Sequence, residues 1–119
     1  MDKTDILRLK SIVAYCNDMD MLYERFGDDF EHFTSDRAYY YALSMCLYQI
    51  SELIIRVKTP ELKEQISSEL PWNEIRAFRN VLAHGYGTVN DRLMWSTAQE
   101  DIPKVEELCL QLIAKAENC

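Results

Sequence analysis

One segment of the chain, residues 79–86, combines residue types suited to phosphodiester chemistry; its sequence is RNVLAHGY. Arginine is a permanent, forked cation that suits a phosphate group, and histidine can give or take a proton near neutral pH. Arg79 and His84 together therefore favour RNA cleavage by internal attack of a 2′-hydroxyl. Since RNA supplies its own nucleophile, we expect no metal and no cofactor, and the chain has no convincing cluster of metal ligands.

The helix expected over residues 71–85 places these side chains on one polar arc. With Arg76 at zero and about 100° per residue, Asn80 lies at about 40°, His84 at about 80° and Arg79 at about −60°. We expect Asn80 to orient the imidazole or bind a phosphate oxygen, and Arg76 and Arg79 to bind the RNA phosphate. The alternative is a solvated basic face on which His84 is only a cation at the helix C-terminus.

Apolar periodicity and a shortage of turn residues predict an all-α domain. The 119 residues include only three glycines and three prolines, too few for many tight turns. We expect a single domain over residues 1–119, folded as an antiparallel four-helix bundle with one or two short extra helices. The expected helices span approximately residues 4–26, 36–58, 61–69, 71–85, 93–98 and 101–117.

Particular residues are expected to bound and pack these helices. Ser35 is the expected N-cap of the second long helix, and Asp101 is expected to open the last helix. The apolar stripe expected on the second long helix consists of Tyr41, Met45, Tyr48, Leu53 and Ile55.

The composition limits the kinds of partner and compartment. A net charge of −7 disfavours general, sequence-blind binding of nucleic acid, although it leaves room for a local basic site. No run of 18 apolar residues could span a membrane, and the N-terminus lacks a signal-peptide pattern, so we expect a cytoplasmic protein. The cysteines are expected to be reduced thiols, mostly in the core: Cys16, Cys46, Cys109 and Cys119.

The segment and its surroundings resemble the HepT-like toxins of the HEPN superfamily. Residues 79–86 match the Arg-x4-His-x-Tyr signature, and Pro71-Trp72 resembles the entry to the motif helix of that family. Residues 50–52 (Ile-Ser-Glu) are similar to its Ile-Gly-Glu turn, with serine in place of glycine. Trp95 followed by residues 101–103 (Asp-Ile-Pro) resembles its C-terminal half, so the likeness covers nearly the whole domain.

This resemblance implies an HEPN-like homodimer whose two motif helices face each other across a composite cleft. It implies a toxin that is a metal-independent endoribonuclease, with Arg79 and His84 catalytic and Asn80 assisting. It also implies that an MntA-like minimal nucleotidyltransferase, the antitoxin, attaches adenosine monophosphate to Tyr86. The added bulk and negative charge would fill the cleft and repel RNA.

The negative net charge of the chain does not favour binding of the negatively charged RNA backbone. A dimer would bring two copies each of Arg76 and Arg79 into one cleft, and this local positive charge favours a narrow, structured substrate such as the end of a transfer RNA. One alternative is a non-catalytic helical module that binds a nucleotidyltransferase partner or its nucleotide. Another is a structural dimer with a fortuitous basic face.

Two further features stay open at the level of sequence. Glu52 either pairs with an arginine at the cleft or lies at the surface. The consecutive tyrosines at residues 39–41 could form a base-stacking platform, but they cannot share one helix face, so some must lie in the core or at a dimer contact.

Overall fold

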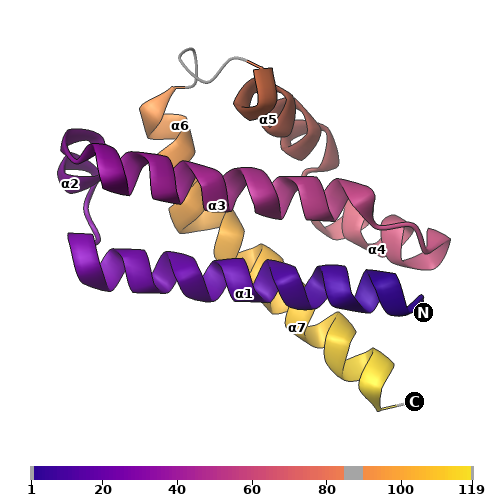
Figure 1. Ribbon diagram of the computed structural model, residues 1–119. Helices are drawn as coiled ribbons and strands as arrows, with labels where there is room; N and C mark the ends of the chain where they lie inside the picture. The colour runs from indigo at the N-terminus through magenta and orange to yellow at the C-terminus, as the bar shows by residue number, and fades with distance from the viewer. Residues whose placement is uncertain (1, 85–89, 119) are drawn as a thin grey trace.

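The computed structural model describes residues 2–84 and 90–118, and every regular element in these ranges is helical (Figure 1). The predicted all-α fold class is confirmed. None of the described helices is long and apolar enough to cross a membrane. The elements are α1 (Lys3–Phe26), α2 (Phe30–Ser35), α3 (Arg37–Arg56), α4 (Pro60–Glu69), α5 (Trp72–His84), α6 (Asp91–Ser96), the π-helical turn η2 (Thr97–Asp101) and α7 (Ile102–Glu117).

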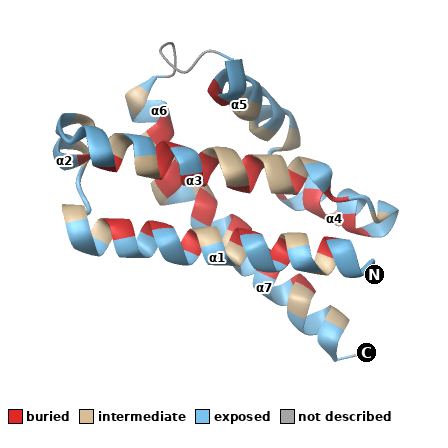
Figure 2. Ribbon diagram, viewed as in Figure 1, coloured by how far each residue is buried: buried red, intermediate tan, exposed pale blue. Residues whose placement is uncertain are grey.

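The bundle is organised around α3. Helices α1 and α3 run antiparallel and side by side, α7 packs against α1, and α5 packs against α3 (Figure 1). The buried residues gather where α1, α3 and α7 face one another (Figure 2). Helices α2, α4 and α6 are short elements at the ends of this arrangement. As a result, α5 belongs to the bundle mainly through its contact with α3.

The expected N-cap of α3 is wrong by one residue. Ser35 lies in the last turn of α2, where its hydroxyl donates to the carbonyl of His32 at 3.5 Å. Asp36 is the cap, because its carboxylate accepts from the amides of Ala38 and Tyr39 at 2.9 and 3.2 Å. A carboxylate there also lies at the positive end of the helix dipole, which stabilises the start of α3.

The apolar stripe expected on α3 is only partly right, since Tyr48 and Leu53 pack half-buried against the core but other members of the stripe do not. Tyr41 and Met45 are about half exposed, at 51% and 49%. The helix is apolar around most of its circumference, so periodicity alone could not select the face that contacts α1 and α5. The buried face consists instead of Tyr39, Leu43, Ser44, Cys46, Leu47, Ile50, Ser51 and Ile54.

The three consecutive tyrosines have three different environments. Tyr39 is fully buried and donates its hydroxyl to the carbonyl of Gly27 at 2.9 Å. Tyr40 is half-buried, and its hydroxyl donates to Asp91 at 3.0 Å. Tyr41 is exposed. The expectation that they cannot share a face is confirmed, and they do not form one stacking platform.

The last helix begins where expected but is not separated from the helix before it. Asp101 occupies the N-cap position of α7, although its side chain makes no capping hydrogen bond, and the chain stays helical from α6 through η2 into α7. The amide of Ile102 donates to the carbonyl of Thr97, five residues back, in a wide π-type turn. Pro103 has no amide to donate, and the first turn of α7 tolerates it.

A buried carboxylate joins α1 to the α3–α4 link. Asp5 is fully buried and accepts from the amides of Lys58 at 3.0 Å and Thr59 at 2.7 Å, from the hydroxyl of Thr59, and from Arg8 at 2.8 Å. Burial by itself would raise the pKa of Asp5. The hydrogen bonds from Thr59, Lys58 and Arg8 outweigh it and lower that pKa to about 2.

Candidate active site

Helix α5 carries the polar residues that the sequence singles out. Arg76, Asn80 and His84 are exposed, whereas the Arg79 side chain is only 27% exposed. Leu82 is the buried residue of this helix. The expected polar arc is therefore present on one helix, with Arg79 at the edge that faces α3.

Arg79 is held against α3 by Glu52. The Nε atom of Arg79 lies 3.0 Å from Oε1 of Glu52, and the Glu52 side chain is only 16% exposed. The distance is that of an ion pair, but the contact lacks the alignment of a hydrogen bond, and the buried Nε has no hydrogen-bond partner within the described part of the chain. Glu52 therefore pairs with an arginine of the candidate site, which the sequence had left open.

The same carboxylate also binds a second arginine. Nη2 of Arg56 lies 3.0 Å from Oε2 of Glu52, one helical turn along α3. Two guanidinium groups thus share one carboxylate, and these three side chains carry a net positive charge. Because Glu52 contacts Nε of Arg79, this ion pair does not use its two Nη atoms. The two Nη atoms carry N–H donors of the planar guanidinium group, which can form paired hydrogen bonds with a phosphate.

His84 ends α5 and is exposed. Five residues separate it from Arg79, which is a rise of about 7.5 Å along a helix. Among the described residues, no hydrogen bond or ion pair joins Arg79, Asn80 and His84 to one another. The helix thus places the three residues on a common element, but no hydrogen-bonded network among the described residues links them. Tyr86, the residue expected to be adenylylated, lies outside the described residues.

The described part of the chain shows no candidate metal centre and no reactive thiol. No group of three or more His, Cys, Asp or Glu residues within residues 2–84 and 90–118 could hold a metal ion. Cys16, Cys46 and Cys109 are buried, as expected. Burial raises the pKa of Cys16 and Cys109 to about 12 and that of Cys46 to about 11. These thiols are therefore neutral and serve as core residues.

An exposed apolar strip of α3 leads up to the Arg79–Glu52 pair. Tyr41 and Met45 are exposed and Tyr48 is half-buried. Spacings of four, three and four residues place Tyr41, Met45, Tyr48 and Glu52 along one side of the helix. We call the first three of these residues the α3 strip. Helical periodicity places the same three residues on the expected apolar stripe, so the sequence does not predict them as a surface feature.

Comparison with known proteins identifies the family. Residues 12–112 match the family model described as "Ribonuclease HepT-like". The chain is 32% identical over 114 residues to "Putative RNase TTE0752" of Caldanaerobacter subterraneus subsp. tengcongensis, covering 95% of this chain and 97% of that protein. It is 32% identical over 77 residues to "Probable ribonuclease HepT" of Thermococcus cleftensis, covering 65% of this chain and 68% of that protein. No solved structure matches the chain significantly. The chain belongs to the HepT-like ribonuclease family.

Proposed function

We propose that this ribonuclease is the toxin of a toxin–antitoxin pair and cleaves RNA with Arg79 and His84. The observation that carries the proposal is the ion pair between Glu52 and Nε of Arg79, on the helix that ends at His84. An arginine fixed in this way presents its Nη atoms with less loss of side-chain entropy than a freely moving one. Arg79 and His84 both belong to the Arg-x4-His-x-Tyr motif of residues 79–86.

In the proposed reaction, His84 removes the proton from the 2′-hydroxyl of the RNA. The 2′-oxygen then attacks the adjacent phosphorus, and the bond from phosphorus to the 5′-oxygen breaks. A proton returns to that 5′-oxygen, so the products are a 2′,3′-cyclic phosphate and a 5′-hydroxyl. Arg79 stabilises the negative charge that develops on the phosphate oxygens. Asn80 assists, and Arg76 binds a neighbouring phosphate.

A homodimer would supply contacts that one chain does not make. No hydrogen bond or ion pair joins Arg79 to His84 in the described part of the chain, so we propose that Arg79 of one protomer acts with His84 of its partner across a shared cleft. The α3 strip supports this arrangement, because its exposed Tyr41 and Met45 lie along the same side of α3 as Glu52, which holds Arg79. Apolar residues of this size are well suited to the core of a protein–protein interface.

Regulation would come from modification of the same site. We propose that an MntA-like nucleotidyltransferase transfers adenosine monophosphate to Tyr86, two residues beyond His84 in the sequence. The added phosphate would repel the RNA backbone and its bulk would obstruct the cleft. A transfer RNA end is the proposed substrate, since a small positive site on an acidic chain suits a narrow structured RNA better than a long one.

Cleavage by the purified protein tests the reaction. The wild type should cut transfer RNA in the presence of a chelator and leave 2′,3′-cyclic phosphate ends. Arg79→Ala and His84→Ala should each lose about a hundredfold or more of the activity. Lys63→Ala removes an exposed cation of α4 and serves as the matched control. Undiminished cleavage by either site variant would contradict the assignment.

The second candidate is a non-catalytic helical module that binds a nucleotidyltransferase or its nucleotide. The observation that favours it is that His84 is exposed and that, among the described residues, no hydrogen bond or ion pair joins it to Arg79. In that case the wild-type dimer would leave RNA intact, and the partner enzyme or ATP would still bind.

A further inference from the structure

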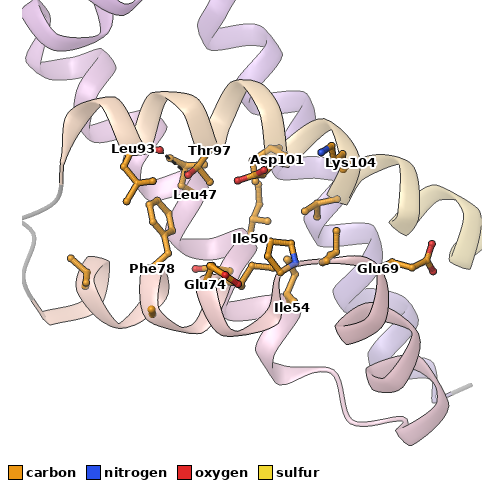
Figure 3. A pocket seen from close by; sticks show the side chains of 18 of the residues that line it. Leu47, Ile50, Ile54, Glu69, Glu74, Phe78, Leu93, Thr97, Asp101 and Lys104 are labelled. Atoms are coloured by element: carbon orange, nitrogen blue, oxygen red, sulfur yellow. Dashed lines mark hydrogen bonds between the residues drawn. The ribbon is translucent and has the colours of Figure 1, made fainter.

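The side of α5 away from its polar arc has an apolar face that the chain covers only in part. Ile75 and Phe78 are half-buried, and Val81 is 40% exposed. These residues form one wall of a groove whose opposite wall is α6, η2 and α7 (Figure 3). Helix α3 forms the floor. Apolar side chains line the floor and the opposite wall, including Leu47, Ile50, Ile54, Leu93, Ile102 and Val105.

The groove is large and elongated. Its volume is about 660 Å³, and it runs along α5 from Pro71 to Val81. Ten residues of helix span about 15 Å, which corresponds to nearly three helical turns. A groove between two helices, with an apolar floor of this length, has the shape that receives an amphipathic helix in known recognition modes. An added helix there would cover the face of α5 that is now partly exposed.

The rim of the groove is acidic. Glu69, Glu74 and Asp101 line it together with one cation, Lys104. Figure 3 shows Glu74 and Asp101 on opposite walls, so a helix lying between them would face carboxylates on both sides. The whole chain carries a net charge of −7, which adds long-range attraction for a basic partner and repulsion for a second copy.

The π-helical turn contributes to the same groove. Its first and last residues, Thr97 and Asp101, both line the groove. Single π turns inside α-helices are uncommon and frequently occur at functional sites. The irregularity of the α6–α7 wall is therefore located where a bound segment would make contact.

We propose that this groove docks a basic amphipathic helix of a partner protein. Apolar side chains of that helix, spaced three and four residues apart, pack against Phe78 and the floor. Lysine or arginine side chains on its flanks pair with Glu74 and Asp101. Arg76 and Asn80 lie on the other side of α5, so the helix binds without covering the polar arc.

A synthetic peptide serves as the probe. A fluorescent helix of about 15 residues, with leucines on one face and lysines on its flanks, matches the length of the groove. Fluorescence anisotropy should show micromolar binding to the wild-type protein, and the same peptide with serines in place of the leucines should not bind. His84→Ala should bind the peptide as the wild type does, which separates this test from that of RNA cleavage.

Two sets of exposed variants locate the binding site. Glu69→Lys/Glu74→Lys reverses the charge of the rim and should weaken binding of the peptide about tenfold. Val81→Asp places a charge in the apolar wall formed by α5 and should also weaken binding of the peptide. Glu64→Lys/Glu107→Lys makes the same charge change at exposed residues that do not line the groove, and it should bind several times more tightly than the rim variant.

Two results would overturn the proposal. One is that the leucine peptide does not bind the wild type; if an anilinonaphthalene sulfonate dye still binds in the groove, the groove is assigned to a small apolar ligand. The other is that the rim variant and its control bind the peptide equally well.

Discussion

Glu52 of α3 contacts Arg79 of α5 through Nε at 3.0 Å, and it contacts Arg56 with its other carboxylate oxygen. This ion pair crosses between two helices and is mostly shielded from solvent. It fixes the arginine at the head of the Arg-x4-His motif against the bundle. In the proposed reaction Glu52 is a positioning residue, because its contact is with Arg79 and its proposed effect on RNA runs through that arginine.

Replacing Glu52 with glutamine tests that role. The amide keeps the shape but loses the charge, so Arg79 should be held less firmly. We expect kcat for RNA cleavage to fall about tenfold with little change in KM, since the lost interaction acts mainly on charge developing in the transition state. Steady-state kinetics measures both constants, with Glu64→Gln as a control at an exposed position of α4. Equal kcat values in Glu52→Gln and the wild type would contradict a positioning role, and recovery by Glu52→Asp would support it.

The shared cleft can be tested by mixing two inactive variants. Arg79→Ala and His84→Ala protomers, refolded together, form mixed dimers in which one of the two Arg79–His84 pairs across the shared cleft stays intact. We expect mixing to restore as much as about a quarter of wild-type activity, because half of the dimers are mixed and each has one intact pair out of two. Cleavage of RNA by the mixture and by each variant alone is the measurement. No recovery in verified mixed dimers would show that the two residues act within one chain.

The α3 strip should control dimer formation. Met45→Glu places a charge in the exposed apolar strip and should shift the protein toward monomer, whereas the folded helical content should not change. Leu110→Glu provides a control, because Leu110 is equally exposed at 50% but lies on α7. Sedimentation equilibrium reports the oligomeric state. A dimer that survives Met45→Glu but not Leu110→Glu would place the interface on α7.

Much of the fold could be predicted from the sequence, and the failures share a physical origin. Leu9, Cys16 and Leu22 of α1 are spaced so that they fall on one side of a helix, and all three are buried. Helix α3 is apolar around most of its surface, so only its packing against α1 and α5 decides which residues are buried. The π turn similarly depends on how α6 and α7 pack rather than on a local signal.

For the candidate site, the sequence identified the motif on α5 but not what holds it. Residue types and spacing single out Arg79 and His84, and the resemblance to HepT-like toxins gives them their predicted roles. The pairing of Glu52 with Arg79 joins helices that are far apart in the sequence, so spacing could only suggest it. The groove beside Phe78 could not be predicted at all, because its walls come from segments that meet only in the folded chain.

Asp5 should make stability depend on pH in the acidic range. Its pKa is about 2 in the folded protein and 3.8 for an unperturbed aspartate, so the folded state favours the charged form. The contribution is fully present above about pH 5 and is lost as the pH falls toward 2, and it amounts to about 2 kcal/mol. Asp5→Asn should be about that much less stable at neutral pH and should lose this part of the acid dependence. Urea unfolding of both proteins from pH 7 to pH 2 measures the difference, and parallel curves would contradict the role given to Asp5.

The most direct test of the account is induced expression in a bacterium, with growth and total RNA followed together. Wild type and Lys63→Ala should arrest growth and cleave RNA, while Arg79→Ala and His84→Ala should grow normally with intact RNA. All four proteins should be recovered folded. Growth arrest and RNA cleavage by His84→Ala, or normal growth and intact RNA with the folded wild type, would contradict the claim that Arg79 and His84 make this chain a toxic ribonuclease.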